Sequence, residues 1–225
     1  MDAVERIRTT RRAVTRSGTR DSERTQAAIL VAATREFAQH GLGGARVDRI
    51  AAGARTNKRM LYYYYGSKEA LFVAVLEDTY ASIRRAEKAL SLLDVDPVES
   101  VHRLVEFTWN YYLAHPEFLT LLNSENLHGA RHVRKSPNVR EMNSPLIETL
   151  AEVLARGARS GVFRGGVDAL QLYVTIAALS YFYLSNNQTL SAVFGRDLAT
   201  ARARKERLQH MVDVVLGYLR ADRCA

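Results

Sequence analysis

The residues from Asn57 to Phe72 combine cations, aromatic hydroxyls and a turn signal in one short stretch, NKRMLYYYYGSKEALF. Tyrosine is bulky and half polar, so four in a row cannot all be buried, and some of their hydroxyls must face water or a polar partner. Lysine and arginine beside exposed tyrosines offer hydrogen-bond donors to base edges and phosphates. The composition therefore indicates a nucleic-acid surface, with a core helix carrying incidental hydroxyls as the alternative.

A short helix over residues 57–64, capped by Asn57 and extended by one residue, sorts these side chains into two faces. Leu61 and Tyr65 lie one turn apart, and we expect their face to be buried. The side chains that then point outward are Lys58, Arg59, Tyr62 and Tyr63. Because a second short helix is predicted over residues 47–54, with a tight turn between the two, the pattern is that of a helix-turn-helix.

The net charge of +8 is concentrated in the first third of the chain. Residues 1–68 contain 14 Lys and Arg against 6 Asp and Glu, whereas residues 69–225 contain 18 against 18. A basic segment followed by a neutral one indicates an anionic partner at the N-terminal end, and nucleic acid is favoured over an anionic membrane surface.

The elements that must position this surface are all predicted to be helical. Residues 1–21 carry six arginines and few large apolar side chains, so we expect a flexible basic arm. A helix follows over residues 22–40, ended by Gly41 in a left-handed cap, and Ser67 begins another that continues toward Leu90. Further helices are predicted near residues 97–114, 116–128, 145–160, 168–190 and 202–221, which gives an all-α fold of about nine helices.

The stretch from Glu23 to Ala81 resembles the DNA-binding domain of the TetR family of transcriptional regulators. The motif residues are Val47, Ile50 and Ala51 and, after the turn, Lys58, Leu61 to Tyr65 and Ser67 to Leu71. The resemblance implies a three-helix DNA-binding domain over residues 22–82, with the helix-turn-helix motif at about 46–65. It also implies an effector-binding and dimerisation domain over residues 83–225, and this C-terminal half is faintly similar to the regulators of pyrimidine utilisation.

The same resemblance implies which residues contact DNA. The base-edge candidates are Lys58, Arg59 and Tyr63. The phosphate candidates are Arg46, Thr56, Tyr62, Tyr64 and Lys68, and Asn57 belongs to the same surface. Three positions depart from the family pattern, because Arg55 stands where the turn usually has glycine, Arg46 replaces a capping Ser or Thr, and Tyr65 replaces phenylalanine. Either Arg55 tolerates a positive φ or the turn is rearranged.

Aromatic residues at helical spacing in the C-terminal half could line an effector pocket or simply fill a core. The five pocket candidates are Trp109, Tyr112, Phe118, Tyr173 and Tyr181. The segment Ala169–Gly195 is apolar on most faces, and an apolar stripe runs from Leu208 to Leu219 through Met211, Val212, Val215 and Leu216. We expect the last two helices of two subunits to form a homodimer interface, with packing inside one subunit as the alternative.

Other chemistries find little support in the sequence. Glu125, His128 and His132 could share a helix face near a metal, but Gly129 interrupts that helix, so neither a metal nor another cofactor is predicted. The one cysteine, Cys224, leaves no intramolecular disulfide, which favours a reducing cytoplasm, and no segment has the pattern of an export signal or a membrane span. No phosphate-binding glycine loop, HExxH, CxxC or GxSxG motif indicates an enzyme.

These observations predict a homodimeric, ligand-responsive transcriptional regulator rather than an enzyme, with repression favoured over activation. Its expected partners are a double-stranded DNA operator and a small-molecule effector. Two alternatives remain, namely an architectural DNA-binding protein without an effector and a metal-dependent enzyme built on Glu125 and the nearby histidines.

Overall fold

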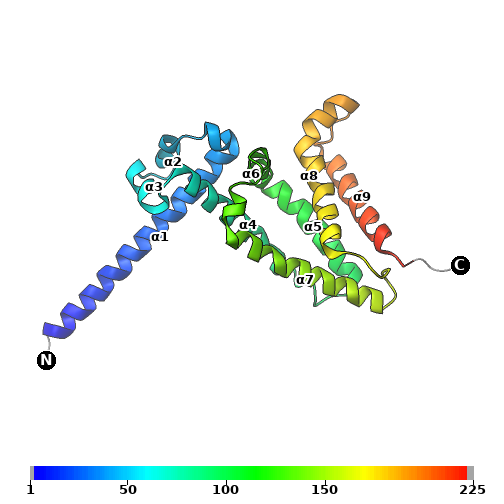
Figure 1. Cartoon of the computed structure of the whole chain (residues 1–225), viewed down its shortest axis with the longest axis horizontal. Coiled ribbons are helices and arrows are strands. Elements are labelled where there is room, and N and C mark those ends of the chain that lie inside the picture. Colours follow the sequence, from blue (N-terminus) through cyan, green and yellow to red (C-terminus); the bar gives the residue numbers. More distant parts are fainter. Residues whose placement is uncertain (1–2, 222–225) are drawn as a thin grey trace. The chain divides into compact units, whose positions relative to one another are not determined.

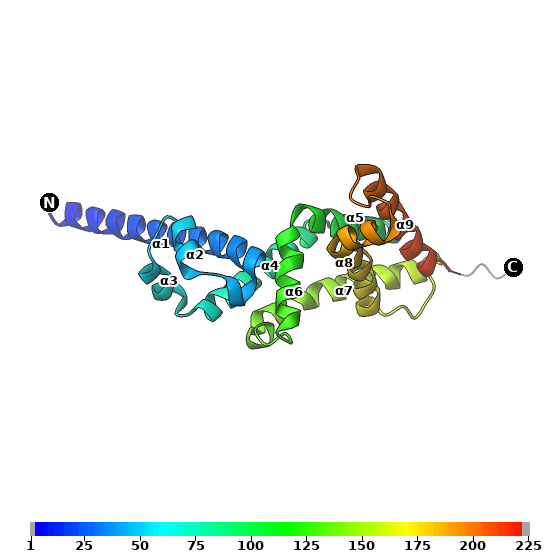
Figure 2. The ribbon, with the colours of Figure 1, turned by 90° about the horizontal axis from the view of Figure 1, so that it is seen from above.

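A computed structural model describes residues 3–221, and the helices account for every regular element of that range (Figure 1, Figure 2). The α-helices of this range are α1 (Ala3–Gly44), α2 (Val47–Gly53), α3 (Lys58–Tyr65), α4 (Lys68–Lys88), α5 (Pro97–Ala114), α6 (Pro116–Leu127), α7 (Pro137–Arg159), α8 (Ala169–Phe194) and α9 (Ala201–Leu219), with a 3-10 turn η1 (Val133–Lys135) between α6 and α7. The predicted all-α class is confirmed, while Cys224 lies outside the described residues.

The chain forms two compact units. The first contains Met1–Leu76 and Thr120–Lys135, and the second contains Glu77–Leu119 and Ser136–Ala225. Each unit has an apolar core of its own.

The first unit is held together by the buried face of α1. Ile29, Ala33 and Phe37 lie at four-residue spacing on this helix and are fully buried, as their periodicity predicts. Phe37 packs edge to face on Phe72 of α4, with the ring centroids 5.1 Å apart. Gly41 has a φ of 62° and interrupts α1 at the residue where the sequence predicts its end.

One carboxylate and one glycine fix α2 against α1. Glu36 accepts a hydrogen bond of 2.8 Å from the backbone N–H of Arg46, the residue before α2. The side chain of Arg46 makes no capping hydrogen bond, as its type predicts, so Glu36 supplies an acceptor at the helix start. A Cβ atom at Gly53 would lie 3.3 Å from the Cβ of Ala32, so glycine here allows a close approach that any side chain would tighten by a few tenths of an ångström.

The second unit is a bundle built on α5, which contacts α7, α8 and α9. Val101, Leu104 and Val105 on α5 are fully buried in its core. Polar side chains cap four of its helices at their N-termini, namely Asp96 for α5, Ser136 for α7, Asp168 for α8 and Thr200 for α9. Figure 1 shows α8 and α9 running side by side, which places the two most C-terminal helices next to each other.

Three boundaries differ from the sequence-based expectations. α1 begins at Ala3, so most of the segment predicted as a flexible arm continues the first helix, and that segment contains no proline and several good helix formers. α7 begins at Pro137 instead of Pro145, because Ser136 caps it and Pro145 is accommodated inside the helix. Residues 120–135 belong to the first unit, because Leu121 is buried in the first core.

Candidate functional site

α3 presents one face to solvent and buries the other. Leu61 is 3% exposed within the first core, whereas Tyr62 is 50% and Tyr63 75% exposed. Lys58 and Arg59 are exposed on the same helix. The structure therefore gathers on one surface the two cations and the two tyrosines that the sequence predicts to point outward.

Asn57 begins α3 as predicted. Its Oδ1 accepts a hydrogen bond of 3.1 Å from the backbone N–H of Met60. This cap places Lys58 and Arg59 in the first turn of α3, where backbone N–H groups without intrahelical partners add to the attraction for a phosphate. The start of the helix thus concentrates positive potential.

The remaining DNA-contact candidates lie around α3. Tyr64 is partly buried against the first core and packs edge to face on Tyr63, with the ring centroids 5.1 Å apart. Lys68, in the first turn of α4, points its Nζ toward the carbonyl oxygen of Gly43 at 3.5 Å. Thr56, in the turn between α2 and α3, is partly buried. These residues and the outward face of α3 all belong to the first unit.

An acidic residue lies among these cations. Asp48 on α2 forms an ion pair with Lys58, and its Oδ2 lies 3.8 Å from Nη2 of Arg46. The three side chains are roughly half exposed, so water and salt screen their attraction. Sequence reasoning missed this carboxylate, although its spacing of two residues from Arg46 was an available signal.

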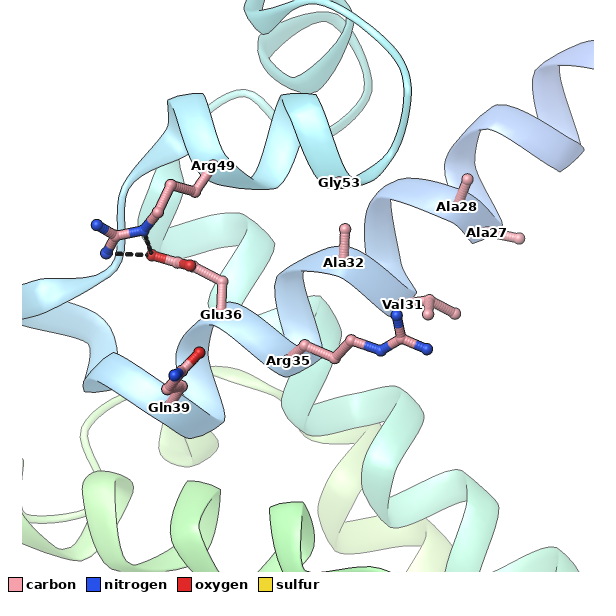
Figure 3. A pocket seen from close by; sticks show the side chains of 9 residues that line it. All are labelled: Ala27, Ala28, Val31, Ala32, Arg35, Glu36, Gln39, Arg49 and Gly53. Carbon is pink, nitrogen blue, oxygen red and sulfur yellow. Dashed lines mark hydrogen bonds and ion pairs between the residues drawn. The ribbon is translucent and has the colours of Figure 1, made fainter.

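A mostly buried carboxylate locks α2 to α1 (Figure 3). Glu36 of α1 and Arg49 of α2 point toward one another, with Oε1 of Glu36 2.8 Å from Nε and 2.6 Å from Nη2 of Arg49. The hydrogen bond from Arg49 is the main cause that lowers the pKa of Glu36 below its ordinary value. The pair lines a hollow of about 470 Å³ beside the small residues Ala32 and Gly53. Glu36 therefore fixes the helix that leads into the turn before α3.

Glu125 and His132 contact each other directly in the first unit. Glu125 is 1% exposed and accepts hydrogen bonds from the backbone N–H groups of His132 and Val133, while its other oxygen lies 2.7 Å from Nδ1 of His132. Burial opposes its ionisation, but these hydrogen bonds together prevail and lower the pKa of Glu125. Among the described residues, no group of three His, Cys, Asp or Glu could hold a metal ion. The cluster ties η1 to α6.

The predicted pocket aromatics lie in the second unit, where several of them fill the core. Trp109 is 2% exposed and packs on Tyr183, with the ring centroids 5.6 Å apart. Tyr112 stacks on Phe118 at 5.4 Å, and both are buried. Tyr181 is partly buried on α8. The contacts of Trp109, Tyr112 and Phe118 account for three of the candidates as packed side chains.

A cavity of about 630 Å³ is bounded by α4, the following loop and α7. Residues that line it include Ala81, Arg84, Glu87, Leu92, Met142 and Leu146. None of the five aromatic candidates lines this cavity, but the hydroxyl of Tyr173 accepts a hydrogen bond of 2.7 Å from Nη2 of Arg84. Sequence reasoning missed Arg84 and Glu87, because a charged pair three residues apart on a helix is usually solvated.

The last two helices keep an apolar surface after the core is formed. The exposed large apolar residues are Leu170, Val174, Phe182, Val193 and Phe194 on α8 and Val214 and Tyr218 on α9. The α9 stripe that the sequence predicts for the interface is instead used inside the subunit, because Met211, Val212, Val215 and Leu219 are buried in its core. None of the described helices, α8 included, combines the length and apolar content needed to cross a bilayer.

Two family models match the chain, and together they span most of it. The model described as "Bacterial regulatory proteins, tetR family" matches residues 29–75, and the model described as "Tetracyclin repressor-like, C-terminal domain" matches residues 97–215. The chain belongs to the TetR family. The resemblance stated for residues 23–81 is thereby confirmed, and this TetR-family chain is a transcriptional regulator.

Relatives of this TetR-family chain are named as transcriptional repressors and regulators. It is 42% identical over 199 residues to the HTH-type transcriptional repressor NicS of Pseudomonas putida, which covers 88% of this chain and 94% of NicS. It is 29% identical over 171 residues to RutR of Escherichia coli K12, covering 76% of this chain and 79% of RutR. The crystal structure of the putative transcriptional regulator SCO4942 from Streptomyces coelicolor matches with a TM-score of 0.68 and 25% identity, covering 88% of this chain and 99% of that one.

The departures from the TetR pattern are accommodated locally. Arg55 has a φ of 52°, so the turn keeps its left-handed residue and a side chain with a Cβ occupies it. The hydroxyl of Tyr65 donates a hydrogen bond of 3.1 Å to the backbone carbonyl of Gln26 on α1. The extra hydroxyl therefore has a partner, and it adds a link between α3 and α1.

Proposed function

We propose that the protein is a homodimeric repressor of transcription that binds an inverted-repeat operator and is released from it by a small molecule. The observation that carries the proposal is the outward face of α3, which presents Lys58, Arg59 and Tyr63 to solvent. A short helix with such a face, held by a preceding helix and turn, has the size and the donors to read the major groove. The naming of NicS as a repressor supports repression over activation.

The proposed DNA contacts divide into two groups. Lys58, Arg59 and Tyr63 read base edges, because they project from the exposed face of α3. Residues around the helix bind phosphates and position it, namely Arg46, Thr56, Asn57, Tyr62, Tyr64 and Lys68. A bacterial transcriptional regulator must reach the chromosome, which lies in the cytoplasm. The proposal therefore places the protein in the cytoplasm.

The proposed dimer uses the exposed apolar side of α8 and α9. Phe182 is 57% and Tyr218 50% exposed. Several exposed large apolar side chains on neighbouring helices usually indicate an interface. A second copy of the chain offers the same two helices, and two helix pairs can pack as a four-helix bundle. A two-fold dimer then presents two copies of α3 to successive major grooves, roughly 34 Å apart.

Selection from a pool of random DNA duplexes tests the proposal. The expected result is one palindromic consensus that the full chain enriches and that a double variant, Arg59→Ala with Tyr63→Ala, does not. Binding without any enrichment would favour an architectural DNA-binding protein. Zinc-dependent hydrolytic turnover, lost in Glu125→Gln, would favour the metal-dependent enzyme.

A further inference from the structure

One carboxylate lies among the cations of the proposed DNA-contacting surface. Asp48, in the first turn of α2, forms an ion pair through Oδ1 with Lys58, in the first turn of α3. Its other oxygen, Oδ2, lies 3.8 Å from Nη2 of Arg46. The side chains of Asp48, Lys58 and Arg46 are 46%, 58% and 67% exposed, and all three belong to the first unit. A DNA backbone that approached this surface would therefore meet a negative charge in contact with two positive ones.

The helices around Asp48 have other residues that fix their starts. The backbone N–H of Arg46, before α2, is bound by Glu36, and the same carboxylate holds Arg49. α3 is capped by Asn57. An acid in the first turn of a helix, like an exposed ion pair, contributes little to stability. Packing thus gives no strong reason for a carboxylate at residue 48, whereas its charge must act on any polyanion that binds here.

We infer that Asp48 is a positioning residue that makes the protein selective for its operator. It holds the ammonium group of Lys58 in one place at the start of α3, and its charge weakens binding to DNA that lacks the operator sequence. The inference rests on the proposed function, because it takes Lys58 as a base-edge contact. It goes further by naming the residue that separates the operator from other DNA.

Specific and non-specific DNA complexes respond differently to such a carboxylate. Attraction between cations and phosphates is independent of sequence and supplies most of non-specific binding. A carboxylate in contact with Lys58 offsets its charge and repels phosphates within the screening length, which is about 10 Å at about 0.1 M salt. A base edge instead needs a donor at a fixed position, and an ammonium group held by one carboxylate keeps further N–H donors. Asp48 therefore weakens non-specific binding more than operator binding, and specificity is the difference between the two.

Counterion release sets the size of the effect. If neutralising Asp48 frees one cation for one more phosphate contact, the slope of log affinity against log salt steepens by about 0.9. At about 0.1 M salt this steeper slope corresponds to roughly an eightfold gain in affinity for non-operator DNA. The operator complex gains the same attraction but loses the fixed position of Lys58, so its affinity rises less. The ratio of operator to non-operator affinity should therefore fall about fivefold in Asp48→Asn.

Fluorescence anisotropy of the full chain tests the inference with two duplexes of equal length, one carrying the selected operator and one of scrambled sequence. In Asp48→Asn, affinity for the scrambled duplex should rise roughly eightfold with a steeper salt slope, and operator affinity should rise less than about twofold. Asp48→Glu keeps the charge and should keep the parental ratio. Glu148→Gln removes an exposed negative charge from α7 in the second unit and should change neither the ratio nor the slope. Equal gains on both duplexes, or no change in an Asp48→Asn variant that thermal unfolding shows to be folded, would overturn the inference.

A double-mutant cycle assigns the effect to the ion pair. In a Lys58→Met background, Asp48→Asn should lose most of its effect on the salt slope, because the cation that it would release is absent. A full effect in that background would overturn the inference, since Asp48 would then act by its own charge and not through Lys58.

Heparin chromatography provides a readout that needs no operator. Heparin offers sulfate groups without a base sequence, so Asp48→Asn should elute at higher salt than the parent and than Asp48→Glu. Elution of all three proteins at the same salt concentration would overturn the inference. A parent chain that selects no operator would instead overturn the proposed function and leave this measurement valid.

Discussion

At the residue scale, the proposed DNA-contacting surface contains a few charged side chains whose surroundings differ. Lys58 forms an ion pair with Asp48. Arg59 lies beside it on the same turn of α3, and both side chains are exposed. Glu36 forms an ion pair with Arg49 and is only 8% exposed. Because their surroundings differ, single substitutions at these residues are expected to have different effects.

Lys68→Ala and Arg59→Ala should weaken DNA binding in different ways. A phosphate contact releases a counterion, whereas a base contact does not, so Lys68→Ala should lower the slope of log affinity against log salt by about one unit for all sequences. Arg59→Ala should instead cost about 1–3 kcal/mol at one or two base pairs and relax the preference there. Fluorescence anisotropy against operator variants at several salt concentrations separates the two. Equal loss of sequence preference in both variants would contradict these roles.

Glu36→Gln should destabilise the first unit by about 2 kcal/mol at neutral pH, because a buried charge-assisted hydrogen bond is lost. The pKa of Glu36 is lowered in the folded state, so its contribution is present above the ordinary carboxyl pKa and is lost as pH falls through the folded value. The difference in melting temperature between the two proteins should therefore shrink below about pH 4. Glu23→Gln, an exposed change on the same helix, is the control. A difference that stays constant down to pH 3 would show that the effect is not electrostatic.

At the element scale, the sequence predicts local structure well where a residue type determines it. Asn57 caps α3 and Gly41 interrupts α1, because both effects depend on the chain within a few residues. The start of α7 was predicted eight residues late, because Pro145 is accommodated inside the helix and Ser136 provides the cap. The cavity with Arg84 and Glu87 was missed, since it needs α4 and α7 to be brought together by the core. Long-range packing is the information that a local pattern lacks.

If the exposed apolar residues of α8 and α9 form the dimer interface, charges placed among them should disrupt it. Phe182→Glu combined with Tyr218→Glu should convert the dimer to a monomer and lower operator affinity by more than tenfold, because the charges would have to be buried in the interface. Val98→Glu, a change at another exposed apolar residue, at the start of α5, should stay dimeric. Analytical ultracentrifugation and anisotropy measure both effects. A double variant that remains a dimer would place the interface on another surface.

Val212→Glu should behave differently, although Val212 belongs to the stripe for which the sequence favours a dimer interface over packing inside one subunit. Val212 is 5% exposed in the core of the second unit, so the charge should reduce the free energy of unfolding by about 3 kcal/mol or more. Thermal unfolding of this variant at pH 7 provides the measurement. If the Val212→Glu variant is a monomer with the same stability as the parent, Val212 lies in the dimer interface.

At the scale of the whole molecule, an effector that binds in the cavity of about 630 Å³ can regulate the protein only if the cavity and the DNA surface influence each other. α4 belongs to both units, with its residues up to Leu76 in the first and its residues from Glu77 in the second. Lys68 lies in its first turn, and Arg84 and Glu87 lie in its last turns. A ligand can shift the operator equilibrium only by its difference in affinity between two states of the protein, and typical couplings are about 1–3 kcal/mol.

If α4 carries this coupling, softening the helix should reduce it without weakening either site. Asp78 is exposed on α4 between the two sets of residues, and glycine there costs about 1 kcal/mol of helix stability relative to alanine. In Asp78→Gly, operator affinity without ligand and ligand affinity without DNA should stay within about twofold of the parent, while the ratio of operator affinities without and with saturating ligand falls toward one. Asp78→Ala is the matched control and should keep the parental ratio. Because coupling is reciprocal, the same loss must appear when ligand affinity is measured with and without operator. A parental ratio in Asp78→Gly would mean that the two sites communicate through another part of the chain.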